Sequence, residues 1–314
     1  MSRKVLLQLV LPLIGLSVLF WLLAFAPGDK HYQPALLEMS VILRDGDGNV
    51  SAMRKGMEQA AKDLNVELRF LTPAEDNSAV EQVQLLEHEV SGAAPAILLI
   101  PADREALGEA VSAAAGKTTL VTVESDMTAW GADASISMDH QALGEALGKA
   151  ALNGVSFGGT VLLLDSLLGD NGVRERMEAA KALLEEKGRQ VRIYRWTSDS
   201  TAFANILRIE RPKAVIAFEA AALTEMAELS RGEEAFPLLY GCGSTAGIAA
   251  ALEKGRVTAI AAVNVFSAGY LAVEAAAKLA RHESWTGASS VGFSIVRQET
   301  MYSSDNQKLL FPVT

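Results

Sequence analysis

The sequence predicts an α/β protein built from two Rossmann-like lobes with parallel sheets. Short, continuously apolar runs alternate with amphipathic, alanine-rich segments along most of the chain. Such alternation is typical of parallel strands that are covered by helices on both faces. The pattern breaks between Met138 and Gln141 and restarts at Gly159, so the units fall into two similar sets. In open sheets of this kind ligands bind beyond the carboxyl ends of the strands, and two facing lobes would form a cleft there.

Eleven runs have the length and aliphatic character of buried strands, which is too many for one sheet in a chain of this size. In chain order the expected strands are 40–43, 67–71, 96–100, 120–123, 134–138, 159–164, 190–196, 214–218, 237–240, 259–263 and 291–297. Helices are expected in most of the intervals, at 50–64, 80–90, 104–115, 141–152, 173–187, 202–209, 221–230, 245–254 and 267–281.

The charge balance and the cysteine content limit what kind of protein this can be. The 314 residues include 28 Lys and Arg against 38 Asp and Glu, a net charge of −10. A protein that binds nucleic acid needs a basic surface to neutralise phosphates, so that class is excluded. Cys242 is the only cysteine, so no intrachain disulfide can form, and its position between two glycines at a strand end favours a small buried side chain over a nucleophile.

The N-terminus carries an apolar run from Val5 to Ala26 behind Arg3 and Lys4. A run of about 20 apolar residues can span a bilayer, and the two cations would keep the N-terminus in the cytoplasm. A cleaved signal peptide is the alternative, but the run is long and Pro27 follows the candidate cleavage site. We therefore expect residues 1–34 to be a membrane anchor or signal segment with a linker, and the rest to be extracytoplasmic.

Several stretches together resemble a known family. They are residues 49–64 (NVSAMRKGMEQAAKDL), 96–103 (AILLIPAD), 137–144 (SMDHQALG), 174–176 (RER) and 241–244 (GCGS). Their order and spacing are similar to those of type I periplasmic binding proteins, the ribose-binding-protein group, which is related to the ligand domains of lac-repressor-type regulators. The resemblance implies three crossovers near Asp139, Asn264 and Ser290. It thus implies an N-terminal lobe of residues 35–139 and 265–290, a C-terminal lobe of residues 140–264 and 291–314, and hinge closure on ligand.

The resemblance also places candidate ligand-binding residues at the strand ends. Arg176 is the foremost, because a guanidinium can form paired hydrogen bonds to vicinal hydroxyls or to a carboxylate. Arg174 is its alternative, since one of the two should face solvent. Trp196 stands where the family has an aromatic residue against a sugar face, although core packing would explain it equally. The other candidates are Asp47, Asn49, Glu124, Asp126, Glu219, Ser244 and Asn264.

Each of these has a plainer explanation as well. Asn49 would cap a helix, Glu124 and Asp126 would lie in an exposed acidic loop, and Arg176 would pair with a neighbouring glutamate on the helix surface. The arginine that the family places after the fourth strand is missing, which weakens the case for a ribose-like ligand. The candidates are mostly acidic, so they would orient a polyol or attract an amine. No metal or cofactor is expected, because the four histidines are scattered and the run from Asp45 lacks the acidic residue of a calcium loop.

We expect a binding protein and not an enzyme. The first hypothesis is a receptor for ABC-type uptake of a small polar solute, with a sugar as the preferred class. The alternative is a membrane-anchored sensory receptor that signals to a histidine kinase, with an amine or another non-sugar ligand. A hydrolase would need a carboxylate pair in the cleft, and no nucleophile elbow, P-loop or dinucleotide fingerprint is present.

Overall fold

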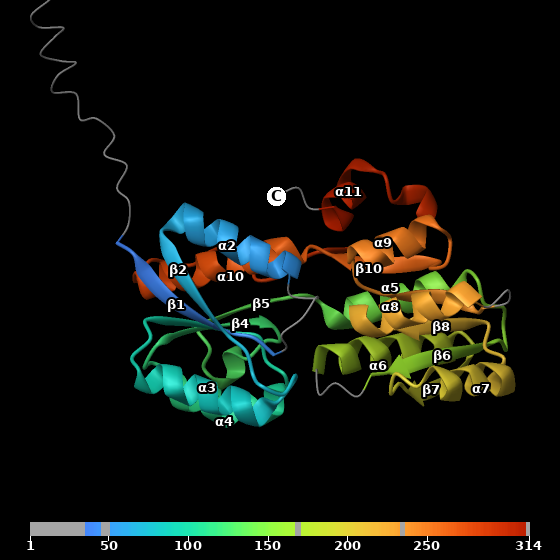
Figure 1. Cartoon of the computed structure of the whole chain (residues 1–314), viewed down its shortest axis with the longest axis horizontal. Coiled ribbons are helices and arrows are strands. Elements are labelled where there is room, and N and C mark those ends of the chain that lie inside the picture. The colour runs from blue at the N-terminus through green and yellow to red at the C-terminus, as the bar shows by residue number, and fades with distance from the viewer. Residues whose placement is uncertain (1–34, 45–50, 167–170, 233–235, 312–314) are drawn as a thin grey trace, which may run out of the picture. The chain divides into compact units, whose positions relative to one another are not determined.

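The computed structural model describes residues 35–44, 51–166, 171–232 and 236–311. Within them, two sheets account for all the named strands (Figure 1). The first sheet has the order β2-β1-β3-β4-β5 and is parallel throughout. Its strands are β1 (Leu37–Ile42), β2 (Val66–Leu71), β3 (Ala96–Leu99), β4 (Thr119–Glu124) and β5 (Ala134–Ser137).

The second sheet has the order β11-β10-β9-β8-β6-β7. Its strands are β6 (Thr160–Asp165), β7 (Gln190–Arg195), β8 (Ala214–Ala217), β9 (Leu238–Cys242), β10 (Ala259–Val263) and β11 (Phe293–Val296). β11 pairs with β10 in the antiparallel direction, which corrects the expectation of purely parallel sheets. The reason is topological, because the helix that follows β10 packs on the first sheet and the chain returns to β10 without a right-handed crossover.

Helices cover both faces of the first sheet. α2 (Ser51–Leu64) and α10 (Val265–Ala280) lie on one side of it, while α3 (Ala79–Ser91) and α4 (Arg104–Ala114) lie on the other (Figure 1). The buried strand residues form one cluster with α2 and α10 and a second with α3 and α4. We call this sheet with its four helices the first lobe.

The second lobe repeats the arrangement. α5 (His140–Leu152) and α6 (Asn171–Glu186) pack on one face of its sheet. The opposite face carries α7 (Ser200–Glu210), α8 (Ala220–Leu229), α9 (Ala246–Glu253) and the C-terminal α11 (Ser304–Leu310), which the sequence pattern did not predict. Three short 3-10 turns, Thr128–Trp130, Ser230–Gly232 and Gln298–Thr300, complete the described elements.

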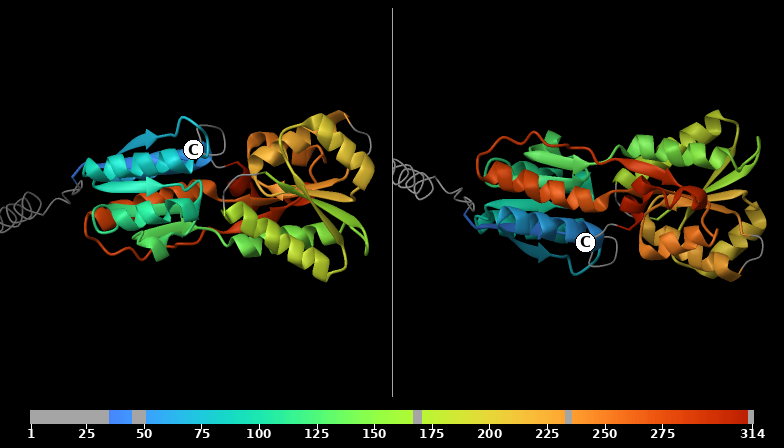
Figure 2. Two further views of the ribbon diagram at one scale, coloured as in Figure 1. Left: turned by 90° about the horizontal axis from the view of Figure 1, so that it is seen from below. Right: turned by 90° about the horizontal axis from the view of Figure 1, so that it is seen from above.

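Glycines let paired helices approach closely in both lobes. A Cβ on Gly56 of α2 would lie 2.0 Å from the Phe266 carbonyl oxygen of α10, and one on Gly269 would lie 2.1 Å from the Met53 carbonyl oxygen. The right-hand view of Figure 2 shows α2 and α10 side by side. In the second lobe, a Cβ on Gly144 of α5 would lie 2.1 Å from the carbonyl oxygen of Arg176 in α6. Only glycine permits these contacts without moving a helix.

The chain passes between the lobes close to these helices. It leaves the first sheet at Ser137 and enters α5 at His140, with the Asp139 side chain accepting a hydrogen bond from the Ala142 amide as the N-cap. It leaves β10 at Val263 and enters α10, where Asn264 is the N-cap. A single parallel bridge joins Ser137 and Ser290 just before β11.

Candidate functional site

A cavity of about 320 Å³ is lined by residues of both lobes. The first lobe contributes Arg44, Ser51, Lys55 and Glu124, which follow β1, begin α2 or end β4. The second lobe contributes residues at the start of α6, α8 and α9 and from α11. The cavity therefore lies beyond the carboxyl ends of the strands, where open α/β sheets bind ligands, and its volume suits a small molecule.

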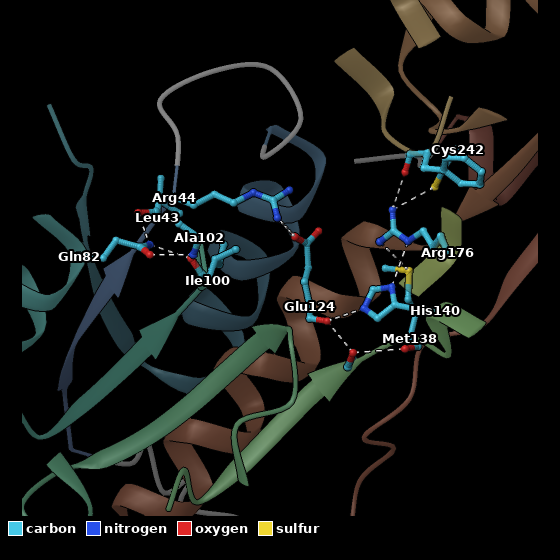
Figure 3. Close-up of polar contacts among 12 residues, drawn as sticks. Leu43, Arg44, Gln82, Ile100, Ala102, Glu124, Met138, His140, Arg176 and Cys242 are labelled. Atoms are coloured by element: carbon cyan, nitrogen blue, oxygen red, sulfur yellow. Dashed lines mark hydrogen bonds and ion pairs between the residues drawn. The ribbon is translucent and has the colours of Figure 1, made fainter. Parts of the chain in front are cut away.

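Arg176 is the buried polar centre of the cavity. It lies in the second turn of α6, and only 6% of its surface is exposed. Its Nη1 donates to the Phe218 carbonyl oxygen at 2.9 Å and to Cys242 Sγ at 3.7 Å, while Nη2 donates to Met138 Sδ at 3.6 Å. Figure 3 shows the guanidinium between Met138 and Cys242. The surrounding contacts thus hold the guanidinium in one orientation.

His140 connects Arg176 to the first lobe. Its Nδ1 lies 3.0 Å from Arg176 Nε, and its Nε2 lies 2.8 Å from the carbonyl oxygen of Glu124 at the end of β4 (Figure 3). An arginine nitrogen only donates and a carbonyl oxygen only accepts, so this geometry assigns the ring proton to Nε2. The imidazole is 7% exposed. A rigid chain of hydrogen bonds consequently runs from β4 through α5 to the guanidinium.

Glu124 shapes the first-lobe side of the cavity. Its backbone has φ of +69°, a left-handed conformation that is rare for a residue other than glycine. Its carbonyl oxygen accepts from Ser137 Oγ at 2.6 Å as well as from His140, and its carboxylate forms an ion pair with Arg44 at 3.0 Å. These contacts compensate the backbone strain and direct the Arg44–Glu124 pair toward the cavity.

A buried side-chain amide holds the segment that follows β1 and carries Arg44. Gln82 of α3 is fully buried, and its Nε2 donates to the carbonyl oxygens of Leu43 at 2.9 Å and Ile100 at 2.8 Å. Its Oε1 accepts from the Ala102 amide at 2.8 Å. All three backbone groups lie just beyond β1 and β3 (Figure 3). Gln82 therefore links the segments that follow these two strands, and its bond to Leu43 helps to position Arg44.

The structure brings five of the predicted residues together around the cavity: Glu124, Arg176, Glu219, Ser244 and Asn264. Asn264 has a second role, because its side-chain oxygen accepts from the Ser267 amide at 3.0 Å and caps α10. Arg174, the alternative to Arg176, is exposed and does not line the cavity. Asp47 and Asn49 lie outside the described residues.

Two predicted residues lie elsewhere. The Trp196 ring packs edge-on against Phe203 at 5.3 Å between centroids, and its indole N–H donates to Glu225 at 2.7 Å. Trp196 belongs to the hydrophobic core of the second lobe, which agrees with the core-packing alternative given in the sequence analysis. Asp126 accepts hydrogen bonds from the amide and hydroxyl of Thr128 at 2.9 and 2.8 Å. Its carboxylate shapes a local turn and does not line the cavity.

Sequence reasoning missed His140, Gln82, Arg44, Lys55 and Lys308. The cavity lining that the structure describes contains the cations Arg44, Lys55, Arg176 and Lys308 and the carboxylates Glu124 and Glu219. The acidic character expected of the candidates is therefore not found in this lining. Gln82 did carry a signal, since it lies on the buried face of α3 beside Leu86, where an amide needs buried partners.

A second depression of about 470 Å³ lies beside the hinge and is lined by Asn264, Ser290 and parts of α10, β11 and α11. Asp305 and Lys308, its two charged lining residues, are both exposed. We assign the ligand site to the smaller cavity, because it contains the buried guanidinium.

Within the described ranges no group of three His, Cys, Asp or Glu side chains is placed to hold a metal ion. No helix in the same ranges is long and apolar enough to cross a bilayer, and the run from Val5 to Ala26 lies outside them.

Comparison with known proteins identifies this architecture. Residues 40–284 match the family model described as periplasmic binding protein domain. An ABC transporter solute binding protein from Agrobacterium vitis with bound D-fucose has a TM-score of 0.80 at 20% identity, covering 87% of this chain and 100% of that one. A carbohydrate transporter solute binding protein from Agrobacterium radiobacter with D-arabinose has a TM-score of 0.81 at 17% identity, covering 88% and 99%.

A chain of the XylFII-LytSN complex has a TM-score of 0.77 at 16% identity, covering 85% of this chain and 99% of that one. No curated protein sequence matches the chain. At these identities the structural likeness establishes the fold, which is that of type I periplasmic binding proteins, as the sequence predicted.

Proposed function

This chain belongs to the periplasmic binding protein domain family, and we propose that it is an extracytoplasmic solute-binding protein for ABC-type uptake of a sugar. The observation that supports this proposal is the cavity between the lobes, with a buried arginine at its centre. The solved relatives from Agrobacterium hold D-fucose and D-arabinose, which makes a monosaccharide derivative the first ligand class to consider.

The side chains around the cavity suit hydroxyl groups. Arg176 supplies a fixed donor, and Ser244 and the amide nitrogen of Asn264 supply further donors. The Asn264 oxygen is engaged as the α10 cap, so its amide nitrogen is the group left for a ligand. Glu219 and Glu124 supply acceptors. A polyol offers both donors and acceptors, so it satisfies such a mixed set better than an apolar ligand does.

Hinge closure accounts for capture and release. Ligand contacts made by both lobes would favour the closed form, since a ligand shifts an equilibrium by its differential affinity for the two states. Arg104 of α4 and Glu175 of α6 form an ion pair between the lobes at 3.6 Å, away from the cavity lining. Both side chains are partly exposed, so this pair contributes little to stability and would not prevent opening.

A sensory receptor is the second candidate. The apolar run from Val5 to Ala26 would hold the binding lobes permanently at the membrane, which suits signalling to a membrane partner. The likeness to the XylFII-LytSN complex also favours a binding domain that acts through another protein. Retention of the N-terminal segment in the mature protein, measured by intact mass, supports this candidate, whereas cleavage before residue 35 argues for a freely diffusing receptor.

A ligand screen tests the primary proposal. The full chain in lipid nanodiscs, which avoid the sugar headgroups of maltoside detergents, is heated with sugars, polyols, amino acids and polyamines. A ligand at 100 times its Kd should stabilise the folded state by about 2.7 kcal/mol. Mass spectrometry should recover the ligand unchanged.

Two variants on one helix make the result specific to the cavity. Arg176→Gln should abolish the stabilisation, while Arg174→Gln, at an exposed position of α6, should retain it. Circular dichroism checks that both variants fold. Hits only among amines, or no hit in any class, would contradict the proposal.

A further inference from the structure

The buried Arg176 guanidinium donates to acceptors of low charge within the described residues. Four of its five N–H groups point to the His140 imidazole, the Phe218 carbonyl, the Cys242 sulfur and the Met138 sulfur. None of these acceptors carries a formal negative charge when the histidine is neutral and the cysteine is a thiol. Among the residues that the structure describes, no carboxylate forms an ion pair with Arg176.

Burial of a cation among weak acceptors costs free energy. A cation removed from water needs a compensating anion or a full set of strong acceptors, and sulfur accepts hydrogen bonds only weakly. The fifth N–H, on Nη2, has no acceptor among the described residues and belongs to a side chain that lines the cavity. A ligand in the cavity can therefore supply an anionic acceptor to this guanidinium.

The start of α8 adds positive potential at the same place. Phe218, whose carbonyl oxygen accepts from Arg176 Nη1, directly precedes the N-cap residue Glu219. The Glu219 side chain does not cap the helix. The first amides of α8 therefore receive no cap from Glu219, whose carboxylate also lines the cavity, and the positive end of the helix dipole lies beside the guanidinium. Helix amides and an arginine that converge in this way favour an anionic oxygen.

Two lysines extend the positive lining. Lys55 of α2 and Lys308 of α11 line the cavity from opposite lobes, and neither forms an ion pair with a described residue. Arg44 differs from them, because Glu124 balances its charge. Both lysines are exposed, so they attract an anion over some distance and do not form the anchor themselves.

From these contacts we propose that the ligand is an acidic sugar, with a carboxylate or phosphate group bound by Arg176 and the first turn of α8. This inference rests on the proposed function and adds the charge of the ligand. The hydroxyl groups of the sugar would then face the Arg44–Glu124 pair and Ser244.

Pairs of neutral and acidic sugars test whether the ligand carries a negative charge. Isothermal titration of the full chain in neutral-lipid nanodiscs compares galactose with galacturonate, glucose with glucuronate, and glucose with glucose 6-phosphate. We expect the acidic member of at least one pair to bind about tenfold more tightly or better, with an advantage that shrinks as salt is added. The carboxylate and phosphate pairs show which anion the site accepts.

The outcomes separate the two proposals. Neutral sugars that bind as tightly as their acids would overturn the acidic-ligand inference and leave the sugar receptor intact. Failure of every neutral and acidic sugar would overturn both.

Lysine variants provide an independent arm for the acidic ligand. Lys308→Gln should weaken the binding of the acidic ligand about two- to fivefold and leave the affinity for a neutral sugar unchanged. Lys254→Gln, at a position outside the cavity, should change neither affinity. Equal losses for acidic and neutral ligands in Lys308→Gln would contradict the charge argument.

Discussion

The side-chain amide of Gln82 makes three hydrogen bonds to backbone groups beyond β1 and β3, and its replacement by methionine tests their contribution. Methionine has nearly the same length and volume, so Gln82→Met removes the polar contacts without opening a large cavity. Gln84 lies on the same helix with its side chain exposed. Gln84→Met is therefore a matched control for helix propensity and for the added sulfur.

The expected loss in the free energy of unfolding follows from the three buried hydrogen bonds that Gln82→Met removes. Each hydrogen bond contributes about 1 kcal/mol net, so the three together amount to about 3 kcal/mol. The loss rises to about 5 kcal/mol if the Ala102 amide, a donor with one proton, finds no other acceptor. For a protein of this size, 1 kcal/mol corresponds to a Tm change of about 2 °C, so a loss of about 6 °C or more is expected.

Thermal unfolding of Gln82→Met and Gln84→Met measures the difference, and amide hydrogen exchange at Ala102 reports the local effect. The Ala102 amide should exchange faster only in Gln82→Met. Ligand affinity should also fall in this variant, because Leu43 precedes the cavity residue Arg44. A Gln82→Met protein that is within about 0.5 kcal/mol of Gln84→Met would refute the reasoning.

Two further substitutions probe packing and ionisation. Gly144→Ala should destabilise the protein by about 1–3 kcal/mol and weaken binding, since its Cβ would lie 2.1 Å from the Arg176 carbonyl oxygen. Gly247→Ala, whose nearest atom is 4.0 Å away, should be neutral or slightly stabilising in the same melt, and equal effects would count against the packing argument. Burial raises the pKa of the Tyr240 hydroxyl from 10.0, an effect that Arg297 opposes. The unfolded chain therefore ionises first, and stability that is complete below pH 10.0 falls as pH rises through the folded-state value. Urea unfolding between about pH 8 and 11 should show a smaller alkaline loss in Tyr240→Phe, and an unchanged slope would argue against this assignment.

The two-sheet architecture could be predicted from sequence because its strands are buried on both faces and appear as continuous apolar runs. β3 and β8 illustrate this, since every residue in them is buried. Arg176 is indicated by the resemblance of residues 174–176 to the arginine motif of the family, and the structure places its side chain in the cavity lining.

Other parts of the site depend on partners far away in the chain. Nothing local to Trp196 indicates that its indole would donate to Glu225, or that its ring would pack against Phe203. The partners of Gln82 are backbone groups, which sequence does not distinguish. Lys308 reaches the cavity from a short C-terminal helix that lacks a strong apolar period. Such contacts are set by tertiary packing, which single-sequence patterns do not encode.

The position of α10 has a consequence for how the protein is made. This helix packs on α2 and on β3, β4 and β5, and its alanines belong to the same core cluster as the first strands. Its residues follow the whole of β6 to β10 in the chain, so a ribosome synthesises most of the second lobe before the first lobe can be completed. Until Ala280 emerges, the face of the first sheet that α2 and α10 share lacks the part of its cover that α10 provides. Nascent chains of this protein are therefore expected to need protection from aggregation until late in synthesis.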